Sequence, residues 1–355
     1  MSKVTYLMKR IGKMNFGNMF KTIDMVHEKN HKFKPFIFFD VVWCGLKYQA
    51  GYVDYYQFEM YKMNGKERKT IITRGINNAI CKKYNDPASI YKFEDKCVFN
   101  EIFNEYLNRD WLKLTGENLN EFKKFIRKHS TIIVKPVGLS CGKGVEKIDT
   151  TKFSAEELYN NLLKNNQILV EEVAKQNKVL NDLYPLSVNT LRVVTLNKKV
   201  VTAYLRIGNA GNVVDNFNHG GMVTAVDVET GVINYEAIDK SKNVFSVHPY
   251  TNKKIVGVKI PMWESVKKLC VDACEKVPEV GYIAWDVCLG EDKPCLIEGN
   301  DFPGHDLYQL PVHRDGNIGL LPVFKKANVL AATAWAFKAS ILKDAGISQE
   351  TTPMI

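Results

Sequence analysis

The sequence predicts an α+β protein in which two α+β lobes follow an N-terminal region rich in helices and aromatic residues. Three observations support this prediction. A strand–loop–strand pattern covers residues 131–148, and β-branched runs broken by glycine and asparagine fill the second half of the chain. Two apolar strands between residues 282 and 300 are also separated by a tight turn, which predicts a hairpin.

Length and charge limit the class of protein. The chain has 355 residues and 45% hydrophobic residues, enough for two or three packed lobes. We place their boundaries at 1–94 for the N-terminal region, 95–174 for a small lobe and 175–355 for a large lobe. The net charge of +10 favours anionic partners such as nucleotides, phosphorylated or uronic sugars, an acidic membrane surface or nucleic acid.

Several classes of protein are not expected. The eight cysteines form no C-x-x-C pair, which argues against a zinc site. They lie in apolar runs, as reduced thiols of a cytoplasmic protein do. The N-terminus has no signal-peptide pattern, and the apolar run 35–43 is too short to span a membrane and contains Asp40.

The N-terminal region begins with a basic arm or helix over residues 1–30. We favour a segment that packs on the body of the protein and turns a solvated face outward. Contact with a membrane or a partner is the alternative. Residues 36–62 have a helical period with a break at Gly51, and residues 63–75 predict a turn and a short strand before a helix over 75–86. The aromatic residues are expected in the core, and no nucleic-acid partner is expected, because no interleaved arginine pattern accompanies them.

The two lobes follow as alternating helical and strand patterns. In the small lobe we expect a helix over 96–107, a helix capped at Asn118 or Asn120, strands over 131–136 and 145–148, a helix capped by the pair Ser154 and Glu157, and a strand over 167–174. In the large lobe we expect strands over 190–196, 199–208, 221–228 and 231–238, a helix over 263–276, strands over 282–290 and 294–300, and a helix over 322–342 that is buried nearly all round.

A glycine-rich loop follows the strand that ends at Lys135. Its spacing differs from Walker A, because only three residues separate Gly138 from Gly142, and Gly144 does not complete a Rossmann pattern. These glycines allow backbone N–H groups to approach a polyanion closely. The loop alone is equally consistent with an ordinary flexible hairpin.

Oxygen ligands gather on the last predicted hairpin. Glu298 and Asn300 are two residues apart and therefore point to the same side of their strand, and Asp286 on the other strand can face them. Carboxylate and amide oxygens among apolar residues suit Mg²⁺ bound together with substrate phosphates. The alternative is a pair of acids that bind arginine or cap a turn.

Two further groups of polar residues accompany these motifs. A strand that ends in Glu171 and Glu172 can present backbone groups to an adenine edge. Arg192 and Arg206 lie on consecutive strands and suit a developing oxyanion or a transferring phosphoryl group, although a surface ion pair explains each arginine alone. The polar loop that follows contains Asn216, His219, Gly220 and Gly221.

Taken in order, these motifs resemble the ATP-grasp superfamily of carboxylate–amine ligases. Lys96 in "EDK" and Lys135 in "VKP" match its two nucleotide-phosphate lysines, and "VEEVA", with Val173, resembles its adenine hinge. Asp286, Glu298 and Asn300 match its magnesium triad, and "EGNDFPG" is similar to its E-x-N-x-x-P-G ending. "GLSCGKG" resembles its flexible lid, and the lid positions assigned to ATP are Gly138, Ser140, Gly142, Lys143 and Gly144.

A closer resemblance is to the sugar-transfer-associated ATP-grasp family. "DVVWCGLKYQAGYVDYYQFEMY", "PLSVNTLRVVTL" and "DNFNHGG" carry it, and it extends over residues 36–325. Cys141 at the tip of the lid departs from many relatives, which have small or charged residues there.

The resemblance implies a fold and a reaction. Two α+β lobes would clasp ATP, and ATP with Mg²⁺ would phosphorylate a substrate carboxylate while Lys135 stabilises the transferred group. An amine would then form an amide, with Arg206 and Arg192 stabilising the oxyanion. Asp301, Gly304 and His305 would line the acceptor side with the polar loop.

The resemblance and the positive charge also indicate the substrates. We expect an amino acid joined to a sugar or glycan in polysaccharide biosynthesis. Ligation of a peptide or small amine is the alternative. A nucleotide-binding or nucleic-acid-binding protein without turnover is the rival from another class.

Overall fold

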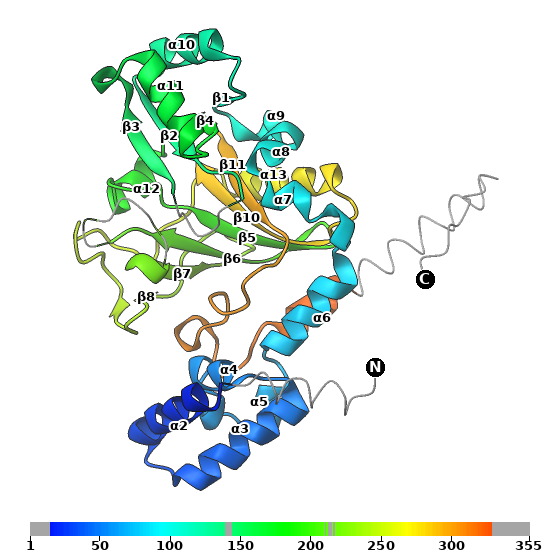
Figure 1. Ribbon diagram of the computed structural model, residues 1–355. Coiled ribbons are helices and arrows are strands. Elements are labelled where there is room, and N and C mark those ends of the chain that lie inside the picture. Colours follow the sequence, from blue (N-terminus) through cyan, green and yellow to red (C-terminus); the bar gives the residue numbers. More distant parts are fainter. Residues whose placement is uncertain (1–14, 139–143, 210, 212–214, 216, 329–355) are drawn as a thin grey trace, which may run out of the picture. The chain divides into compact units, whose positions relative to one another are not determined.

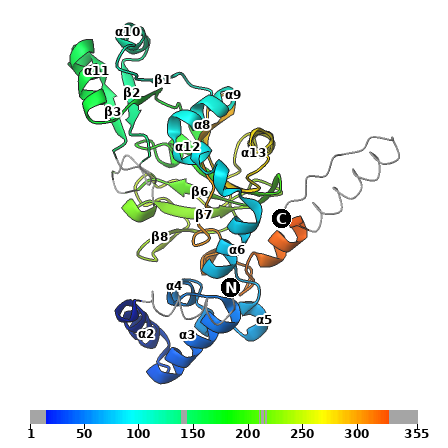
Figure 2. The same ribbon diagram turned by 45° about the vertical axis from the view of Figure 1, so that its right-hand side comes forward.

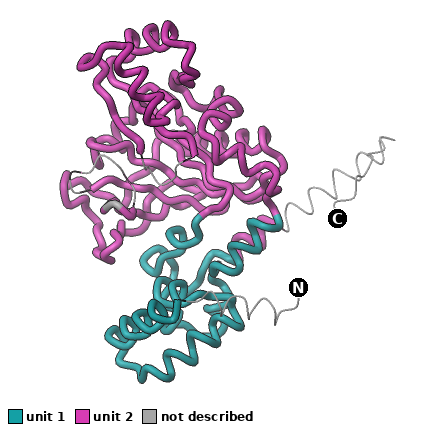
Figure 3. The backbone as a smooth tube through the Cα atoms, in the orientation of Figure 1, with its two compact units in different colours: residues 1–83, 304–321 teal, residues 84–303, 322–355 magenta. Residues whose placement is uncertain are grey.

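The computed structural model describes residues 15–138, 144–209, 211, 215 and 217–328 (Figure 1). The chain forms two compact units: unit 1 contains residues 1–83 and 304–321, and unit 2 contains residues 84–303 and 322–355 (Figure 3). The three-part division 1–94, 95–174 and 175–355 stays a prediction. In the part of the chain that is described, no helix has the length and apolar character needed to cross a membrane.

Unit 1 consists of helices, and Gly51 interrupts them as predicted. Gly51 is the N-cap of the helix that follows the break. The elements are α2 (Phe16–Asn30), α3 (Lys34–Tyr48), α4 (Tyr52–Gln57), η1 (Met60–Lys62), α5 (Gly65–Arg68) and α6 (Arg74–Tyr84). The short strand predicted within residues 63–75 is wrong. The backbone N–H of Ile72 donates to Gln309 of the returning segment 304–321, which takes the place of a strand partner.

The core of unit 1 confirms only part of the expectation for its aromatic residues. Tyr55 and Phe58 are buried in a cluster with residues of α2 and α3. Phe36, Phe39 and Trp43 of α3 are exposed instead. The helix is apolar on all sides, so its sequence does not indicate which side packs inward.

The smaller sheet of unit 2 has four antiparallel strands in the order β1-β4-β2-β3. They are β1 (Trp111–Lys113), β2 (Thr131–Lys135), β3 (Glu146–Asp149) and β4 (Leu169–Glu172). Helices α10 (Leu119–Lys128) and α11 (Ala155–Lys164) cover its apolar side (Figure 1). Asn118 is the N-cap of α10, and the Ser154 hydroxyl accepts the Glu157 N–H at 3.2 Å, so the predicted helix starts are confirmed.

The larger sheet has seven antiparallel strands in the order β11-β10-β5-β6-β7-β8-β9. They are β5 (Leu191–Leu196), β6 (Lys199–Ile207), β7 (Met222–Val226), β8 (Ala237–Asp239), β9 (Val244–Phe245), β10 (Tyr282–Leu289) and β11 (Pro294–Asn300). The predicted β10–β11 hairpin is confirmed. The predicted strand 231–238 is largely wrong, because only its last two residues belong to β8.

Helices bury the apolar face of the larger sheet. Helix α13 (Trp263–Lys276) agrees with its prediction, and it packs on this face in one cluster with Phe93, Phe103 and Trp285 (Figure 2). The other helices of unit 2 are η2 (Pro87–Ser89), α7 (Tyr91–Glu94), α8 (Lys96–Ile102), α9 (Asn104–Leu107), η3 (Thr150–Lys152), α12 (Lys178–Leu183) and η4 (Phe217–His219).

The C-terminal helix is described only over residues 321–328. Lys325 and Lys326 are exposed there, so this part is not buried all round as predicted. The remainder of the predicted helix lies outside the described residues. In unit 1, the 3-10 turn η5 (Pro311–His313) belongs to the returning segment.

Candidate active site

The polar face of the larger sheet carries several predicted site residues side by side. Asp286 on β10 lies opposite Glu298 on β11 and opposite Arg192 on β5. Arg192 in turn lies opposite Tyr204 on β6, and Arg206 is two residues further along that strand. Because residues opposite one another and residues two apart share a face, all five side chains are on one side of the sheet. The apolar side, with Trp285, faces α13.

Asp286 is enclosed by arginines. Its side chain is 3% exposed, and Arg192 donates to both carboxylate oxygens, with Nη2 at 2.6 Å from Oδ2. Arg206 Nη1 also donates to Oδ2 at 3.0 Å. Burial alone would raise the pKa of Asp286, but the two guanidinium charges lower it. Asp286 therefore stays ionised inside the protein.

A second buried aspartate completes this network. Arg206 Nη2 donates to Asp215 Oδ1 at 2.9 Å, and the backbone N–H of Thr190 donates to Asp215 Oδ2 at 2.9 Å. Burial raises the pKa of Asp215, and the charge of Arg206 opposes this. Asp215 is not among the predicted site residues, although this residue directly precedes Asn216, which lies outside the described residues. Nothing in the spacing marks an aspartate within a polar loop as an arginine partner.

The predicted magnesium ligands form a set of oxygen donors on this face. The side chain of Glu298 is 44% exposed, and its Oε1 lies 4.0 Å from Arg192 Nη2. Burial is the main cause that raises the pKa of Glu298, and the negative charge of Asp286 raises it further. Asn300 Nδ2 contacts the Ala284 carbonyl at 3.4 Å. Two carboxylates and an amide oxygen in this arrangement fit a hard cation, with Glu298 as the accessible carboxylate, because the arginines already bind both oxygens of Asp286.

The strand that carries Glu298 and Asn300 is positioned from behind by aromatic rings. A Cβ atom on Gly299 would lie 2.8 Å from the ring of Phe93 and 3.0 Å from the ring of Phe99. Only glycine lets β11 approach these rings so closely. Gly299 thus belongs to the site through packing rather than through chemistry.

Lys135 is held by a buried carboxylate in the smaller sheet. Glu171 Oε2 lies 2.5 Å from Lys135 Nζ, and Glu171 Oε1 accepts from Arg109 at 2.7 Å and from Asn100 at 2.9 Å. Burial would raise the pKa of Glu171, but the charges of Arg109 and Lys135 lower it strongly. The sequence predicted a role only for the backbone of Glu171, as a contact for adenine. It indicated neither Arg109 nor Asn100 as a partner of the side chain. Their contacts join distant parts of the chain, so no local pattern indicates them.

Lys96 is the first residue of α8 and is half-buried. Burial lowers the pKa of its ammonium group. The charge of Glu298 opposes this shift, and the charge of Lys135 adds to it. Lys96 is thus electrostatically coupled to both predicted groups, the metal ligand and the lysine at the end of β2.

The predicted hinge and lid are described in part. Glu172 is the last residue of β4, its N–H donates to the Asp110 carbonyl at 2.9 Å, and Val173 follows outside the strand. Gly138 and Gly144 have φ angles of 82° and 70°, values that favour glycine. Ser140, Cys141, Gly142 and Lys143 lie outside the described residues, as do residues 212–214 of the polar loop.

The remaining predicted substrate residues are divided between the units. His219 ends η4, Gly220 is exposed and Gly221 is buried just before β7, and Asp301 follows β11 in the same unit. Gly304 and His305 belong to unit 1. There His305 Nε2 lies 2.8 Å from Asp54 Oδ1, and its ring packs edge-on against Phe58. His305 is thus engaged within unit 1, and its proposed contact with substrate stays a prediction.

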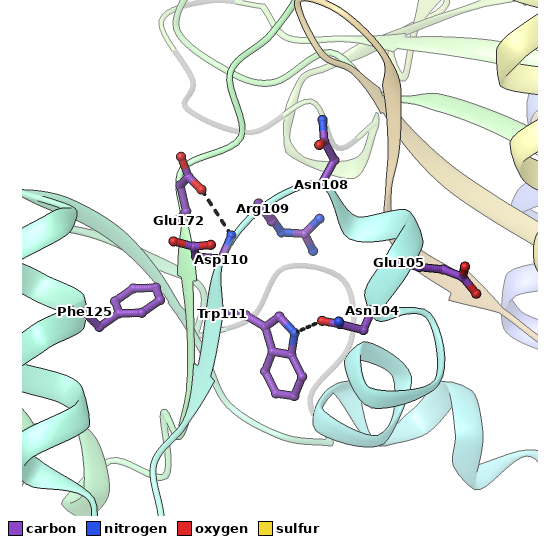
Figure 4. A pocket seen from close by; sticks show the side chains of 8 residues that line it. All are labelled: Asn104, Glu105, Asn108, Arg109, Asp110, Trp111, Phe125 and Glu172. Atoms are coloured by element: carbon purple, nitrogen blue, oxygen red, sulfur yellow. Dashed lines mark hydrogen bonds between the residues drawn. The ribbon is translucent and has the colours of Figure 1, made fainter.

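A polar cavity of about 560 Å³ lies beside β1 and β4 (Figure 4). Asp110, Glu172 and His129 there offer atoms within 4.8 Å of one another, a spacing that a metal ion could bridge. Asp110 Oδ2 already binds Lys128 and His129, so an ion-pair network explains this cluster. The cavity is lined by Asn104, Glu105, Asn108, Arg109, Asp110, Trp111, Phe125 and Glu172.

Several solved structures are distantly similar to this chain. The ATP-grasp ligase PsnB, solved with a phosphomimetic precursor variant, Mg and ADP, is 13% identical with a TM-score of 0.42, and the match covers 70% of this chain and 61% of PsnB. The D-alanine–D-alanine ligase of Bacillus anthracis is 13% identical with a TM-score of 0.41, and the match covers 77% of this chain and 80% of that ligase. D-cycloserine synthetase DcsG is 11% identical with a TM-score of 0.41, over 72% and 77% of the two chains. The chain thus spans less than two thirds of PsnB.

The sequence itself gives a more specific result. A comparison with curated proteins finds no match. The profile of one family matches residues 76–325, which is most of the chain and includes both sheets. The chain therefore belongs to the sugar-transfer associated ATP-grasp family.

Proposed function

We propose that the protein is an ATP-dependent carboxylate–amine ligase that joins an amino acid to a sugar or glycan in polysaccharide biosynthesis. The observation that carries the proposal is the polar face of the larger sheet, where oxygen donors and two arginines share one side and Glu298 is coupled to Lys96 and Lys135. Membership of the ATP-grasp family supports ATP as the substrate that occupies this region.

The proposed reaction has two steps. A carboxylate oxygen of the substrate attacks the γ-phosphorus, the bond to the bridging oxygen breaks, and ADP leaves with the electron pair. The amine nitrogen then attacks the acyl carbon and loses a proton, and inorganic phosphate leaves as the C–O bond breaks. The products are an amide, ADP and phosphate.

Residues of both sheets and of α8 would take different roles in this reaction. Lys96 and Lys135 would bind the phosphates, with Glu171 holding Lys135 in place, and the backbone at Glu172 and Val173 would meet the adenine. Arg192 and Arg206 would stabilise the oxyanion, since pairing with aspartates occupies only part of each guanidinium fork.

The metal and the lid complete the proposal. Asp286, Glu298 and Asn300 would hold Mg²⁺, which neutralises charge on the triphosphate when bound. Substrate contacts are proposed for Asp301 and the loop with Asn216, His219, Gly220 and Gly221. The lid over ATP is proposed for residues 138–144. A cytoplasmic reaction agrees with the free, buried thiols of the seven described cysteines.

The substrates can be tested with the purified protein, ATP and Mg²⁺ against a panel of amino acids combined with uronic acids or glycans. We expect ADP release only with one such pair, and a product whose mass equals the sum of the pair minus water. ADP release with short peptides instead would assign the protein to peptide ligation. Nucleotide binding without ADP release for any combination would assign it to non-catalytic binding proteins.

Glu298→Ala tests the proposed metal site in the same assay. Its side chain is partly exposed, so the variant is expected to fold, and loss of a metal ligand is expected to slow ADP release by roughly 10²-fold or more. An unchanged rate in a folded variant would contradict the proposed metal site.

A further inference from the structure

Helix α3 is apolar on two opposite sides. Its inner side consists of Ile37, Val41, Cys44 and Tyr48, which are buried in unit 1 at helical spacing. Its outer side carries Phe36, Phe39, Trp43 and Leu46, also at helical spacing, and these are 71%, 67%, 52% and 52% exposed. Figure 1 shows α3 beside α2 along one edge of unit 1. A helix that is apolar all round is normally buried all round, so the outer side requires a cover.

The outer side of α3 is part of a larger aromatic surface. The ring of Phe33 lies 5.8 Å from that of Phe36, and Phe20 of α2 stacks on Phe38 at 6.2 Å. Phe20 and Phe33 are themselves more than half exposed. We name this surface the aromatic ridge, with the members Phe20, Phe33, Phe36, Phe39, Trp43 and Leu46. Single exposed apolar residues are ordinary on protein surfaces, but a contiguous patch marks a binding surface.

Lysines border the aromatic ridge. Lys34 and Lys47 stand at the two ends of α3, and Lys47 Nζ lies 4.8 Å from the centre of the Trp43 ring. The acid of α3, Asp40, is bound by Arg68 at 2.6 Å and faces inward. The described residues 15–48 contain five lysines against three acids, and the exposed Asp24 pairs with Lys34 at 2.6 Å. The surroundings of the ridge are therefore cationic and complement an anionic surface.

The chemistry of the ridge favours lipid over a protein partner. Between Lys34 and Lys47 the exposed residues of α3 are Pro35, Phe36, Phe39, Val42, Trp43 and Leu46. Of these, only Trp43 has a side-chain hydrogen-bond donor. Protein interfaces carry about one hydrogen bond per 100–200 Å² and are depleted in lysine. Helices that lie in a membrane interface instead combine Phe, Trp and Leu with flanking lysines.

We propose that unit 1 docks onto the surface of a bilayer that contains anionic lipids, with α3 lying in the plane of the interface. The aromatic ridge would enter the boundary between headgroups and acyl chains, and Lys34 and Lys47 would contact the phosphates. This inference rests on α2 and α3 alone and is independent of the ligase activity.

The test measures binding of the full-length protein to vesicles. Wild-type protein is expected to co-sediment with vesicles of phosphatidylcholine and phosphatidylglycerol, and less with phosphatidylcholine alone. Phe39→Ala combined with Trp43→Ala is expected to lower the partition coefficient by at least about tenfold, since two large apolar side chains no longer leave water. Phe153→Ala, which removes an exposed phenylalanine from unit 2, is the matched control and is expected to bind like wild type.

A second readout does not depend on a disruptive variant. Lipids brominated in their acyl chains are expected to quench part of the tryptophan fluorescence of the bound protein. Trp43→Phe is expected to keep binding and to lose most of that quenching. Absence of wild-type binding to the anionic vesicles would overturn the proposal. A concentration-dependent dimer that the double variant abolishes, without vesicle binding, would overturn it in favour of a second copy of the chain.

Discussion

Arg192 binds both carboxylate oxygens of Asp286 from the neighbouring strand of the larger sheet. Both side chains are nearly inaccessible, so the pair is shielded from water and salt. This pairing lets a carboxylate of the proposed magnesium site stay ionised within an apolar sheet.

The pair should show strong coupling in a double-mutant cycle. Arg192→Ala leaves Asp286 buried with only Arg206 as a cationic partner, and we expect a loss of about 3–5 kcal/mol in the free energy of unfolding. Because Asp286→Ala removes the charge that Arg192 neutralises, the double variant should lose clearly less than the sum of the single variants. Urea denaturation measures all three, and additive losses would show that the contact is energetically unimportant.

The adjacent acids at the end of β4 should behave differently. Glu171→Gln leaves Arg109 and Lys135 without their buried counter-charge, and we expect about 3–5 kcal/mol of destabilisation. Glu172→Gln changes a partly exposed acid that accepts one N–H from Asp110, and about 1 kcal/mol or less is expected. Equal losses in denaturant titrations would contradict the assignment of Glu171 as the buried anchor.

Gly299 should be required although it offers no ligand atom. Gly299→Ala pushes β11 away from Phe93 and Phe99, and overpacking of this kind costs about 1–3 kcal/mol. Thermal unfolding gives the stability. The same variant should weaken Mg²⁺-dependent ADP release, because the Glu298 and Asn300 side chains move with the strand. A variant with wild-type stability would show that β11 can shift without cost.

His248 predicts how stability depends on pH. Its ring is buried, Nε2–H donates to the Gly208 carbonyl at 2.9 Å, and Nδ1 accepts the Tyr250 N–H at 3.1 Å. Burial lowers the pKa of His248 below its usual value of about 6.5, so the folded protein prefers the neutral ring. This contribution to stability is complete above about pH 6.5 and is lost as the pH falls towards the lowered pKa.

The measurement compares urea unfolding at about pH 7.5 and about pH 5.5 for wild type and for His248→Gln. Wild type should lose more stability on acidification than the variant, which retains every other titrating group. Identical losses would mean that protonation of His248 does not contribute.

Patterns within single strands predicted the β10–β11 hairpin and the side chains that share its polar face. The β10–β11 hairpin follows from two apolar runs around a tight turn, and the two-residue period of a strand then places Glu298 with Asn300. The same period and the register of β5 and β6 bring Arg192 and Arg206 to the face of Asp286. The sequence left open that the acids of the hairpin bind arginine, and Asp286 does bind both arginines in the structure.

Side-chain contacts that depend on how strands and loops come together were not predictable. Arg109 meets Glu171, and Asp215 meets Arg206, only after two sheets have formed. The strand predicted near Ile72 fails for the same reason, because the side chain of Gln309 supplies both backbone hydrogen bonds there. For α3, the uniform apolar composition predicted burial but could not identify the side that remains exposed.

The proposal that Lys135 binds nucleotide phosphate can be tested most directly by calorimetry with Mg²⁺ and a non-hydrolysable ATP analogue. Lys135→Ala should weaken binding by roughly 10–100-fold, as expected for loss of a charged hydrogen bond to phosphate. Lys147→Ala, which removes an exposed lysine from the paired strand β3, should bind like wild type. Equal affinities of the two variants, with folding retained, would contradict an ATP site at Lys135.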